Sequence, residues 1–215
     1  MSELGKRTIV GVLLIAVALG VSFIGGTLFA IAIAAVATIM YLEWSRIVRS
    51  WGPLWMIGGF FYCLIPAVCL IAIRILGPQF NVGNGFFVLI WAFLVTWSTD
   101  IGAYFAGRAI GGPKLAPSIS PNKTIAGLVG GVISAAAIAG SWAHIVGLPA
   151  SFLWMGAPFA VTAQMGDLFE SWMKRRAGVK DSGTWLPGHG GLLDRLDGLV
   201  PVAVLTFALM VSGNG

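Results

Sequence analysis

The chain has 215 residues, of which 58% are hydrophobic and only 10% are charged. A soluble globular domain usually carries about 25% charged residues, so this composition excludes an ordinary soluble protein. Thirteen basic residues outnumber eight acidic ones, but they lie between apolar runs, which favours anionic lipids and phosphate substrates over nucleic acid. The composition predicts an all-α fold, a polytopic helical integral membrane protein.

Seven apolar runs are candidate membrane spans, because about 20 apolar residues cross about 30 Å of hydrocarbon. They cover residues 8–25, 26–42, 53–73, 86–105, 125–146, 150–168 and 199–211. Gly25-Gly26 and Gly77-Pro78 mark turns between them. The first run has no small-x-small cleavage site, so we predict a retained span rather than a signal peptide.

The positive-inside rule gives the orientation. With a cytoplasmic N-terminus and one crossing per run, one basic residue, Arg74, falls outside. The others fall inside: Lys6, Arg7, Arg46, Arg49, Arg108, Lys114, Lys123, Lys174, Arg175, Arg176, Lys180 and Arg195. We expect residues 1–96 to form N-terminal transmembrane helices, and residues 97–215 to form a catalytic region whose loop, 167–197, is cytoplasmic.

Small residues recur on one face of the fifth run, at Gly127, Gly131, Ala135 and Ala139. Such a face lets another helix approach closely. Two interpretations are open, packing within the chain and contact between two copies in a homodimer.

Two acids, Asp100 and Asp167, lie near the cytoplasmic ends of otherwise apolar runs. A carboxylate at the centre of a membrane helix costs about 2.5–3.5 kcal/mol and less toward the ends, so such acids usually have a function. Pairing with Arg108 or Lys174, or simple hydration, is the structural alternative. Matching depth on different helices favours one shared polar site.

Among the acids that follow residue 168, Asp194 and Asp197 are three residues apart. A helix beginning near Leu192 would place both on one face, although acids are also favourable at a helix start because of its dipole. Mg²⁺ prefers carboxylate and phosphate oxygens, so Asp167 and Asp194 are plausible ligands.

The same loop contains a glycine-rich turn, Pro187-Gly188-His189-Gly190-Gly191, just before the predicted helix. Exposed backbone amides there could bind an anion, and His189 could donate to a phosphate. Lys174, Arg175 and Lys123 could bind phosphate or could serve only as positive-inside charges. A plain connecting turn is the alternative for the glycines.

The pattern from Ser171 to Asp197 resembles, without a gap, the signature of phosphatidate cytidylyltransferases (CDP-diacylglycerol synthases). The matching residues are Ser171, Lys174-Arg175, Lys180-Asp181, Gly183, Leu186-Pro187, His189-Gly190-Gly191-Leu192 and Asp194-Arg195-Leu196-Asp197. Residues 100–104, 114–124 and 166–171 resemble the same family. Ala126 departs from it, because members commonly carry Glu at this position.

The resemblance implies transfer of a cytidylyl group from CTP to phosphatidate, which gives CDP-diacylglycerol and pyrophosphate and requires Mg²⁺ and possibly a second cation. It also implies a membrane enzyme of bacterial type, with its active site at the cytoplasmic face and a homodimeric state.

The resemblance, together with the placement of these residues in the sequence, assigns three groups of roles. The catalytic group is Asp167, Asp194, Lys174, Arg175 and His189. The metal ligands are Asp167, Asp194 and Asp197. The substrate-binding group is Lys123, Lys180, Arg195, Asp100, Ser171, Gly190 and Gly191.

Two other functions are alternatives, a different phospholipid enzyme and a transporter. A CDP-alcohol phosphatidyltransferase would carry a DG-x2-AR opening, which this sequence lacks. A transporter would place its acids near the membrane midplane between repeated halves, whereas these acids are expected at one face and no repeat is visible.

Overall fold

The computed structural model describes residues 3–185 and 190–212. The elements in chain order are α1 (Glu3–Ile24), α2 (Gly26–Ile47), α3 (Pro53–Leu76), the 3-10 turn η1 (Gly77–Phe80), α4 (Gly85–Ile110), β1 (Lys114–Ala116), β2 (Ser120–Thr124), α5 (Ile125–Ile145), α6 (Ala150–Arg176), α7 (Leu193–Leu196) and α8 (Leu199–Ser212). Each of the seven predicted runs therefore coincides with a helix, which confirms the helical class.

Within the described part of the chain, four helical segments are long and apolar enough to cross a membrane: Gly26–Ile47, Pro53–Phe80, Gly85–Ile110 and Ile125–Ile145. The apolar stretches of α1 and α8 are shorter, at Thr8–Ile24 and Leu199–Ser212. The chain is therefore an integral membrane protein by length and composition, while the count of seven spans stays a prediction.

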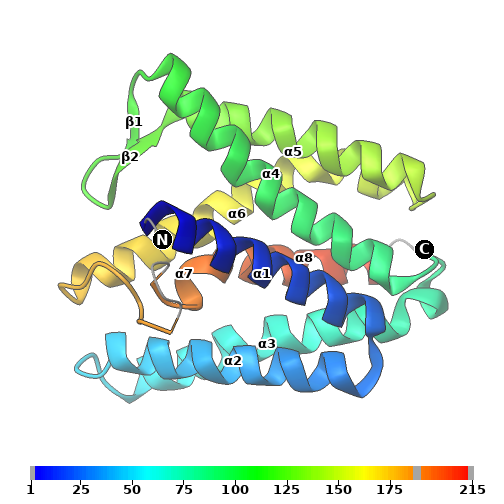
Figure 1. Cartoon of the computed structure of the whole chain (residues 1–215), viewed down its shortest axis with the longest axis horizontal. Coiled ribbons are helices and arrows are strands. Elements are labelled where there is room, and N and C mark those ends of the chain that lie inside the picture. The colour runs from blue at the N-terminus through cyan, green and yellow to red at the C-terminus, as the bar shows by residue number, and fades with distance from the viewer. Residues whose placement is uncertain (1–2, 186–189, 213–215) are drawn as a thin grey trace.

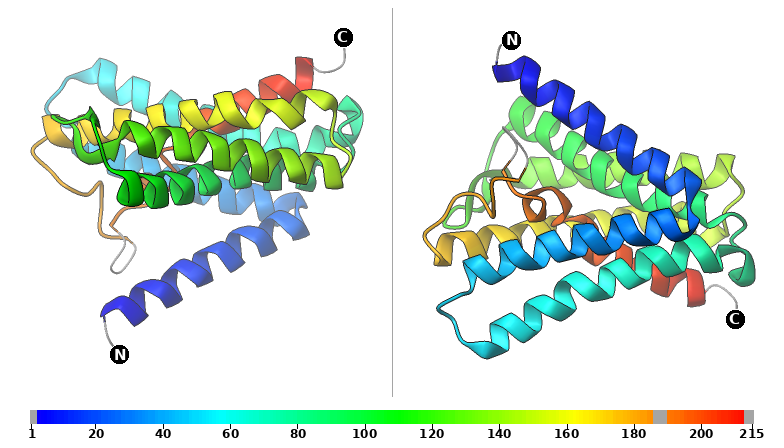
Figure 2. Two further views of the ribbon diagram at one scale, coloured as in Figure 1. Left: turned by 90° about the horizontal axis from the view of Figure 1, so that it is seen from above. Right: turned by 60° about the horizontal axis from the view of Figure 1, so that its bottom comes forward.

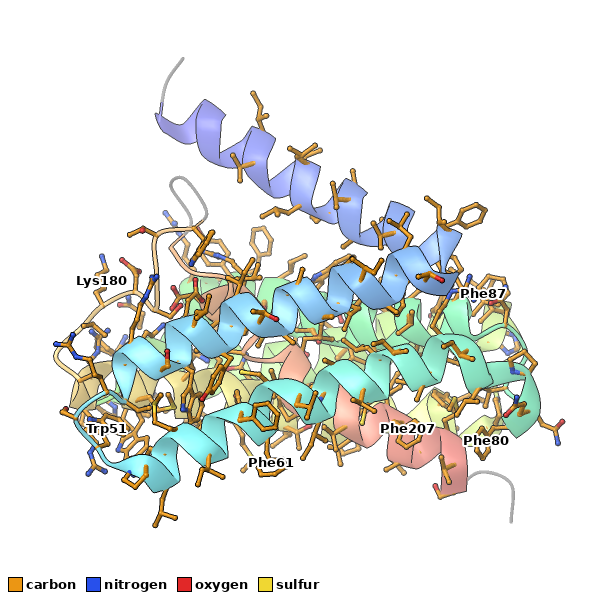
Figure 3. The ribbon with its side chains drawn as sticks, turned by 90° about the horizontal axis from the view of Figure 1, so that it is seen from below. Trp51, Phe61, Phe80, Phe87, Lys180 and Phe207 are labelled. Atoms are coloured by element: carbon orange, nitrogen blue, oxygen red, sulfur yellow. The ribbon has the colours of Figure 1, made fainter. Side chains whose placement is uncertain are left out.

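The long helices run back and forth between two ends of the bundle (Figure 1). Residues 48–52, 111–124, 177–185 and 190–192 lie between helices at one end, which we call the site end. Residues 77–84 and 146–149 connect them at the opposite end. Figure 3 places Trp51 and Lys180 at the site end, and Phe80 and Phe87 at the opposite end. α1 diverges from the bundle toward its own N-terminus (Figure 2).

α4 lies at the centre of the largest apolar core. Val88, Leu89 and Trp91 are fully buried on it, and the Trp91 ring packs edge-on against Phe152 of α6. The Trp91 indole N–H donates to the Phe152 carbonyl over 3.1 Å, so its one polar atom is paired within the core. This packing joins α4 to α6, the two helices that carry Asp100 and Asp167.

The small-residue face of α5 packs inside the molecule, against α4. A Cβ added at Gly127 would lie 2.9 Å from the Ala103 carbonyl oxygen, and one at Gly131 would lie 2.8 Å from that of Thr99. Ala135 and Ala139 are fully buried on the same face. The interpretation as packing within the chain is therefore confirmed.

A two-stranded hairpin between α4 and α5 was not expected from the sequence. β1 pairs antiparallel with β2, and Thr124 at the end of β2 caps α5 by accepting the Gly127 N–H over 3.0 Å. The hairpin lies at the site end (Figure 1) and carries Lys123.

At the opposite end, Arg74 holds the end of α1. Its guanidinium donates to the carbonyl oxygens of Ser22 over 2.8 Å and Phe23 over 3.0 Å. These carbonyls belong to the last turn of α1, where the helix itself supplies no donors. The single basic residue predicted to lie outside therefore has a structural role.

Candidate active site

Four elements bring polar side chains together at the site end. Asp100 comes from the C-terminal half of α4, Lys123 from β2, and Asp167 from α6 after its apolar part. Asp197 comes from the residues between α7 and α8. We call Asp100, Asp167 and Asp197 the carboxylate cluster.

Lys123 is the cation paired with this cluster. Its Nζ lies 2.5 Å from Asp167 Oδ2 and donates to Gln164 Oε1 over 3.0 Å. Residues on α6 therefore fix the position of an amino group that comes from the hairpin. Ser171, one turn beyond Asp167, donates its hydroxyl to Asp167 Oδ1 over 3.3 Å.

The carboxylates of the cluster repel one another. Burial raises the pKa of Asp197 to about 7, and the charges of Asp167 and Asp100 act in the same direction. Lys123 opposes this effect, and the Gly198 N–H donates to Asp197 Oδ1 over 2.7 Å. The cluster therefore concentrates more negative charge than Lys123 neutralises.

A second network surrounds Lys174. Its Nζ lies 2.9 Å from Glu170 Oε2 and 2.7 Å from Asp194 Oδ1, and all three side chains are largely buried. Burial acts to raise the pKa of Asp194, but hydrogen bonds with the side chains of Glu170 and Lys174 and with the Gly191 N–H hold it below its usual range. Asp194 is therefore an ionised and fixed carboxylate.

Asp194 also shapes the loop that precedes it. Its carboxylate accepts the Ser182 N–H over 2.9 Å and the Gly191 N–H over 2.8 Å. Gly190 has a φ of 81°, a backbone conformation that favours glycine, and a Cβ there would lie 2.8 Å from Asp194 Oδ2. The glycines next to Asp194 are thus required by close backbone approach.

The structure brings some predicted residues together and separates others. Asp100, Lys123, Asp167 and Asp197 interact with one another, whereas Asp194 interacts with Lys174. The predicted helix around Asp194 and Asp197 is present as α7, with Asp197 at its C-terminal end.

The remaining predicted residues have varied positions. The Arg175 Nε donates to the Ile119 carbonyl over 3.3 Å, which ties α6 to the hairpin. Lys180 and Arg195 are exposed, and Arg195 interacts electrostatically with Asp100 of the carboxylate cluster. His189, with Pro187 and Gly188, lies outside the described residues.

One residue that sequence reasoning missed is Glu43, near the end of α2. It is fully buried, and its carboxylate accepts hydrogen bonds from the backbone N–H groups of Leu192 and Leu193 and from the Ser182 hydroxyl. No local pattern could reveal it, because its partners lie about 140–150 residues further along the chain.

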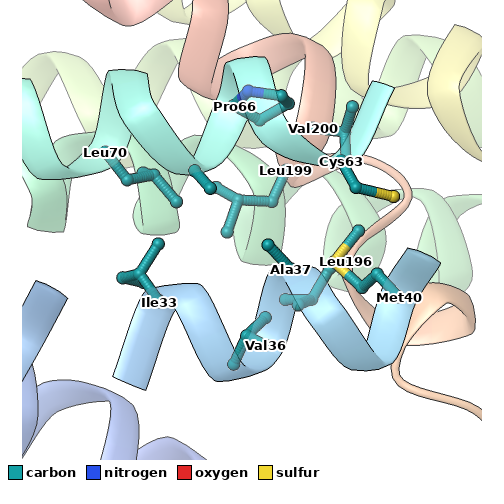
Figure 4. Close-up of a pocket in the computed structure, with 11 residues that line it drawn as sticks. Ile33, Val36, Ala37, Met40, Cys63, Pro66, Leu70, Leu196, Leu199 and Val200 are labelled. Carbon is teal, nitrogen blue, oxygen red and sulfur yellow. The ribbon is translucent and has the colours of Figure 1, made fainter. Parts of the chain in front are cut away.

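An apolar pocket lies between α2, α3 and the start of α8 (Figure 4). Residues of α2, α3 and α8 line it together with Leu196, including Met40, Cys63, Pro66 and Leu199. Leu196 and Leu199 flank Asp197 and Gly198 in the sequence. The lining of the pocket therefore includes the residues on either side of the segment that carries Asp197.

The donor set suits a hard divalent cation. The charges of Asp100, Asp167 and Asp197 act on one another, and Mg²⁺ is usually held by one or two carboxylates, water and substrate phosphates. Among residues 3–185 and 190–212, no three His, Cys, Asp or Glu side chains form a complete ligand set. Such a site would need the phosphates of a substrate to complete the coordination.

Comparisons with known proteins agree with this chemistry. The model of the cytidylyltransferase family matches residues 49–212. The chain is 44% identical to a phosphatidate cytidylyltransferase of Brucella suis over 182 residues, which cover 81% of this chain and 62% of the relative. It is 36% identical to the enzyme of that name from Haemophilus influenzae over 173 residues, 76% of this chain and 60% of the relative.

A third relative, the phosphatidate cytidylyltransferase of Bacillus subtilis, is 43% identical over 129 residues, 59% of this chain and 48% of the relative. The chain therefore matches at most 62% of the length of these three relatives.

Proposed function

This chain belongs to the cytidylyltransferase family, and from that premise we propose that it transfers a cytidylyl group from CTP to phosphatidate. The products are CDP-diacylglycerol and pyrophosphate. The observation that carries the proposal is the interaction of Lys123 with the carboxylate cluster at one end of a membrane bundle. These residues come from two helices, the hairpin and the segment between α7 and α8. The region 97–215 contains these residues, and we propose it as the catalytic part.

The reaction joins two anions, so neutralising and aligning phosphates is the main task of the site. An oxygen of the lipid phosphate attacks the α-phosphorus of CTP. A new P–O bond forms as the bond to the bridging oxygen breaks, and pyrophosphate leaves with that oxygen. No step needs a nucleophile from the protein.

We assign the roles from charge and position. Asp167 and Asp197, with Asp194 nearby in the sequence, are the proposed ligands of Mg²⁺, which supplies Lewis-acid charge neutralisation to phosphate oxygens when bound. Lys123 and Lys174 provide fixed positive charge beside these carboxylates. Arg175, Lys180, Arg195, Ser171, Asp100, Gly190, Gly191 and His189 are proposed to complete substrate binding.

The apolar pocket supports a lipid as one of the two substrates. An acyl chain in contact with Leu196 and Leu199 would bring its phosphate close to Asp197, because these residues are adjacent in the chain. Burial of apolar chain in such a pocket is favourable by about 25 cal/mol per Å² of surface removed from contact with water.

We further propose that the site end faces the cytosol, where CTP is available. Ten basic residues with described side chains belong to the site end or to the helix segments leading to it, and Arg74 lies at the opposite end. This asymmetry is typical of a cytoplasmic face. A homodimer also remains a proposal, and it would need a surface other than the α4–α5 glycine contact.

The direct test is incubation of the purified protein with phosphatidate, Mg²⁺ and CTP labelled at the α-phosphate. Label should appear in the lipid phase, and pyrophosphate should appear in equal amount. Omission of phosphatidate or addition of a chelator serves as the control and should abolish both signals. Absence of lipid label under all of these conditions would refute the proposed function.

A further inference from the structure

Glu43 is the most completely buried acid that the proposed mechanism does not use. It lies on α2, upstream of the region matched by the family model, and its side chain has 0% exposure. A buried carboxylate is costly unless hydrogen bonds replace its water. Here the donors all come from the loop and helix around Asp194.

The hydrogen bonds of Glu43 join two separate segments of the loop. The Ser182 hydroxyl donates to Glu43 Oε2 over 3.1 Å. On the other side, the N–H groups of Leu192 and Leu193 donate to Oε1 over 3.0 Å and to Oε2 over 2.7 Å. One carboxylate therefore holds the entry and the exit of the loop together.

Asp194 also forms hydrogen bonds with both of these loop segments. It accepts the N–H of Ser182 while the hydroxyl of Ser182 donates to Glu43. Ser182 is thus shared by the two carboxylates. A displacement of Glu43 would be transmitted to Asp194 through this residue.

The loop is shaped to fit the Glu43 side chain. A Cβ at Gly191 would lie 2.7 Å from both Glu43 carboxylate oxygens, and one at Gly183 would lie 2.9 Å from Glu43 Cδ. Contacts this short are absent from real packing, so both positions exclude any larger residue without movement of the carboxylate.

Glu43 also satisfies the start of α7. Backbone N–H groups in the first turn of a helix have no partners within the helix, and Glu43 accepts two of them. α7 contains Asp194, and Asp197 directly follows its last residue, Leu196. The place of both acids therefore depends on a bond made to α2.

We infer that Glu43 is a positioning residue for cytidylyl transfer, which fixes α7 so that Asp194 and Asp197 face the phosphates. This role rests on the proposed function. Glu43 does not touch the reacting atoms, and it acts through the backbone of residues 182–193.

The test compares Glu43→Gln and Glu43→Asp in the full-length protein. Glutamine has nearly the same shape but only one acceptor oxygen, so it cannot accept from both backbone N–H groups on separate oxygens. Aspartate keeps both acceptors on a shorter side chain. Phe29→Ala is the matched control, because Phe29 is a buried residue of α2 near the opposite end and far from the loop.

We expect Glu43→Gln to lower kcat at least tenfold while the KM for phosphatidate stays within threefold. The kcat of Glu43→Asp should be at least threefold higher than that of Glu43→Gln. Phe29→Ala should lower the unfolding temperature yet keep kcat within threefold. The inference is overturned if Glu43→Gln retains kcat within threefold of the wild type, or if Phe29→Ala loses as much kcat at an equal loss of thermal stability.

Amide hydrogen exchange separates this inference from the proposed function. The N–H groups of Leu192 and Leu193 should exchange at least tenfold faster in Glu43→Gln than in the wild type, with or without turnover. Unchanged exchange there would overturn the positioning role even in an active enzyme. A wild-type protein without cytidylyl transfer would refute the function, while exchange would still report whether Glu43 holds the loop.

Discussion

Lys174 balances two acids in a space that has little access to water. Its side chain is 12% exposed, whereas those of Glu170 and Asp194 are 2% and 8% exposed. A buried ion pair adds little net stability, but removal of one partner leaves an uncompensated charge. The sequence suggested that Lys174 contacts substrate or marks the membrane boundary, and the structure adds a role in holding Asp194.

We predict that Lys174→Met destabilises the protein by about 3 kcal/mol, because the buried carboxylate of Asp194 loses its cation and Glu170 loses a hydrogen-bond donor. Thermal unfolding in detergent measures this loss. Lys174→Arg, which keeps the charge, should lose less than half as much. Equal unfolding temperatures for the wild type and Lys174→Met would contradict the assignment of a structural ion pair.

Replacement of Asp167 tests the catalytic role of the carboxylate cluster. Asp167→Asn should lower kcat about 100-fold or more, because it removes a carboxylate that pairs with Lys123 and that we propose as a ligand of Mg²⁺. Cytidylyl transfer to phosphatidate measures the effect. Thr162→Val on the same helix is the control and should keep kcat within threefold, and near-normal turnover in Asp167→Asn would exclude Asp167 as a ligand.

At the scale of helices, α4 and α5 pack closely through small residues. We predict that Gly131→Val destabilises the protein by about 1–3 kcal/mol, because the new side chain would meet the Thr99 carbonyl oxygen and force the helices apart. Gly58→Ala on α3 is the control, since a Cβ there meets nothing within 4 Å. The unfolding temperatures of the two variants in the same detergent measure the difference. An equal effect of both changes would argue against tight α4–α5 packing.

The helices themselves were predictable, because long apolar runs between glycine, proline and basic residues leave few alternatives in a membrane. The hairpin was not, since residues 114–124 contain two prolines and no alternating pattern. Its strands form because α4 and α5 pack side by side and bring the ends of this connection together. Lys123 was therefore expected only before a helix, and its extended backbone was missed.

The candidate site was predictable where residues cluster in the sequence. Asp100 and Asp167 are unusual for their apolar surroundings, and the residues from 171 to 197 form a continuous pattern. Glu43 resembles an ordinary charge at a helix end next to Trp44, so only its contacts in the folded chain reveal it. The sequence also suggested Asp167 and Asp194 as a pair, whereas the structure gives them different basic partners.

The arrangement of the whole molecule predicts its sidedness. Single cysteines at Lys180 and Gln79 would lie at opposite ends of the bundle, both at exposed positions, while the natural Cys63 and Cys69 are buried. In intact cells, a membrane-impermeant maleimide should label Gln79→Cys, and Lys180→Cys only after permeabilisation. The parent protein without added cysteines is the control, and the reverse labelling pattern would place the site end outside the cell.

The contact between Glu43 and the loop has a consequence for how related proteins are compared. Every residue of the recognisable pattern could be retained in a chain whose second helix is altered or exchanged, and that chain would still score as a member of the family. Its loop would nevertheless lack the carboxylate on α2 that accepts hydrogen bonds from the loop backbone here. Chimeras that exchange the segment before residue 49 should therefore keep an acid at the position of Glu43. Retention of the family pattern alone does not predict whether they are active.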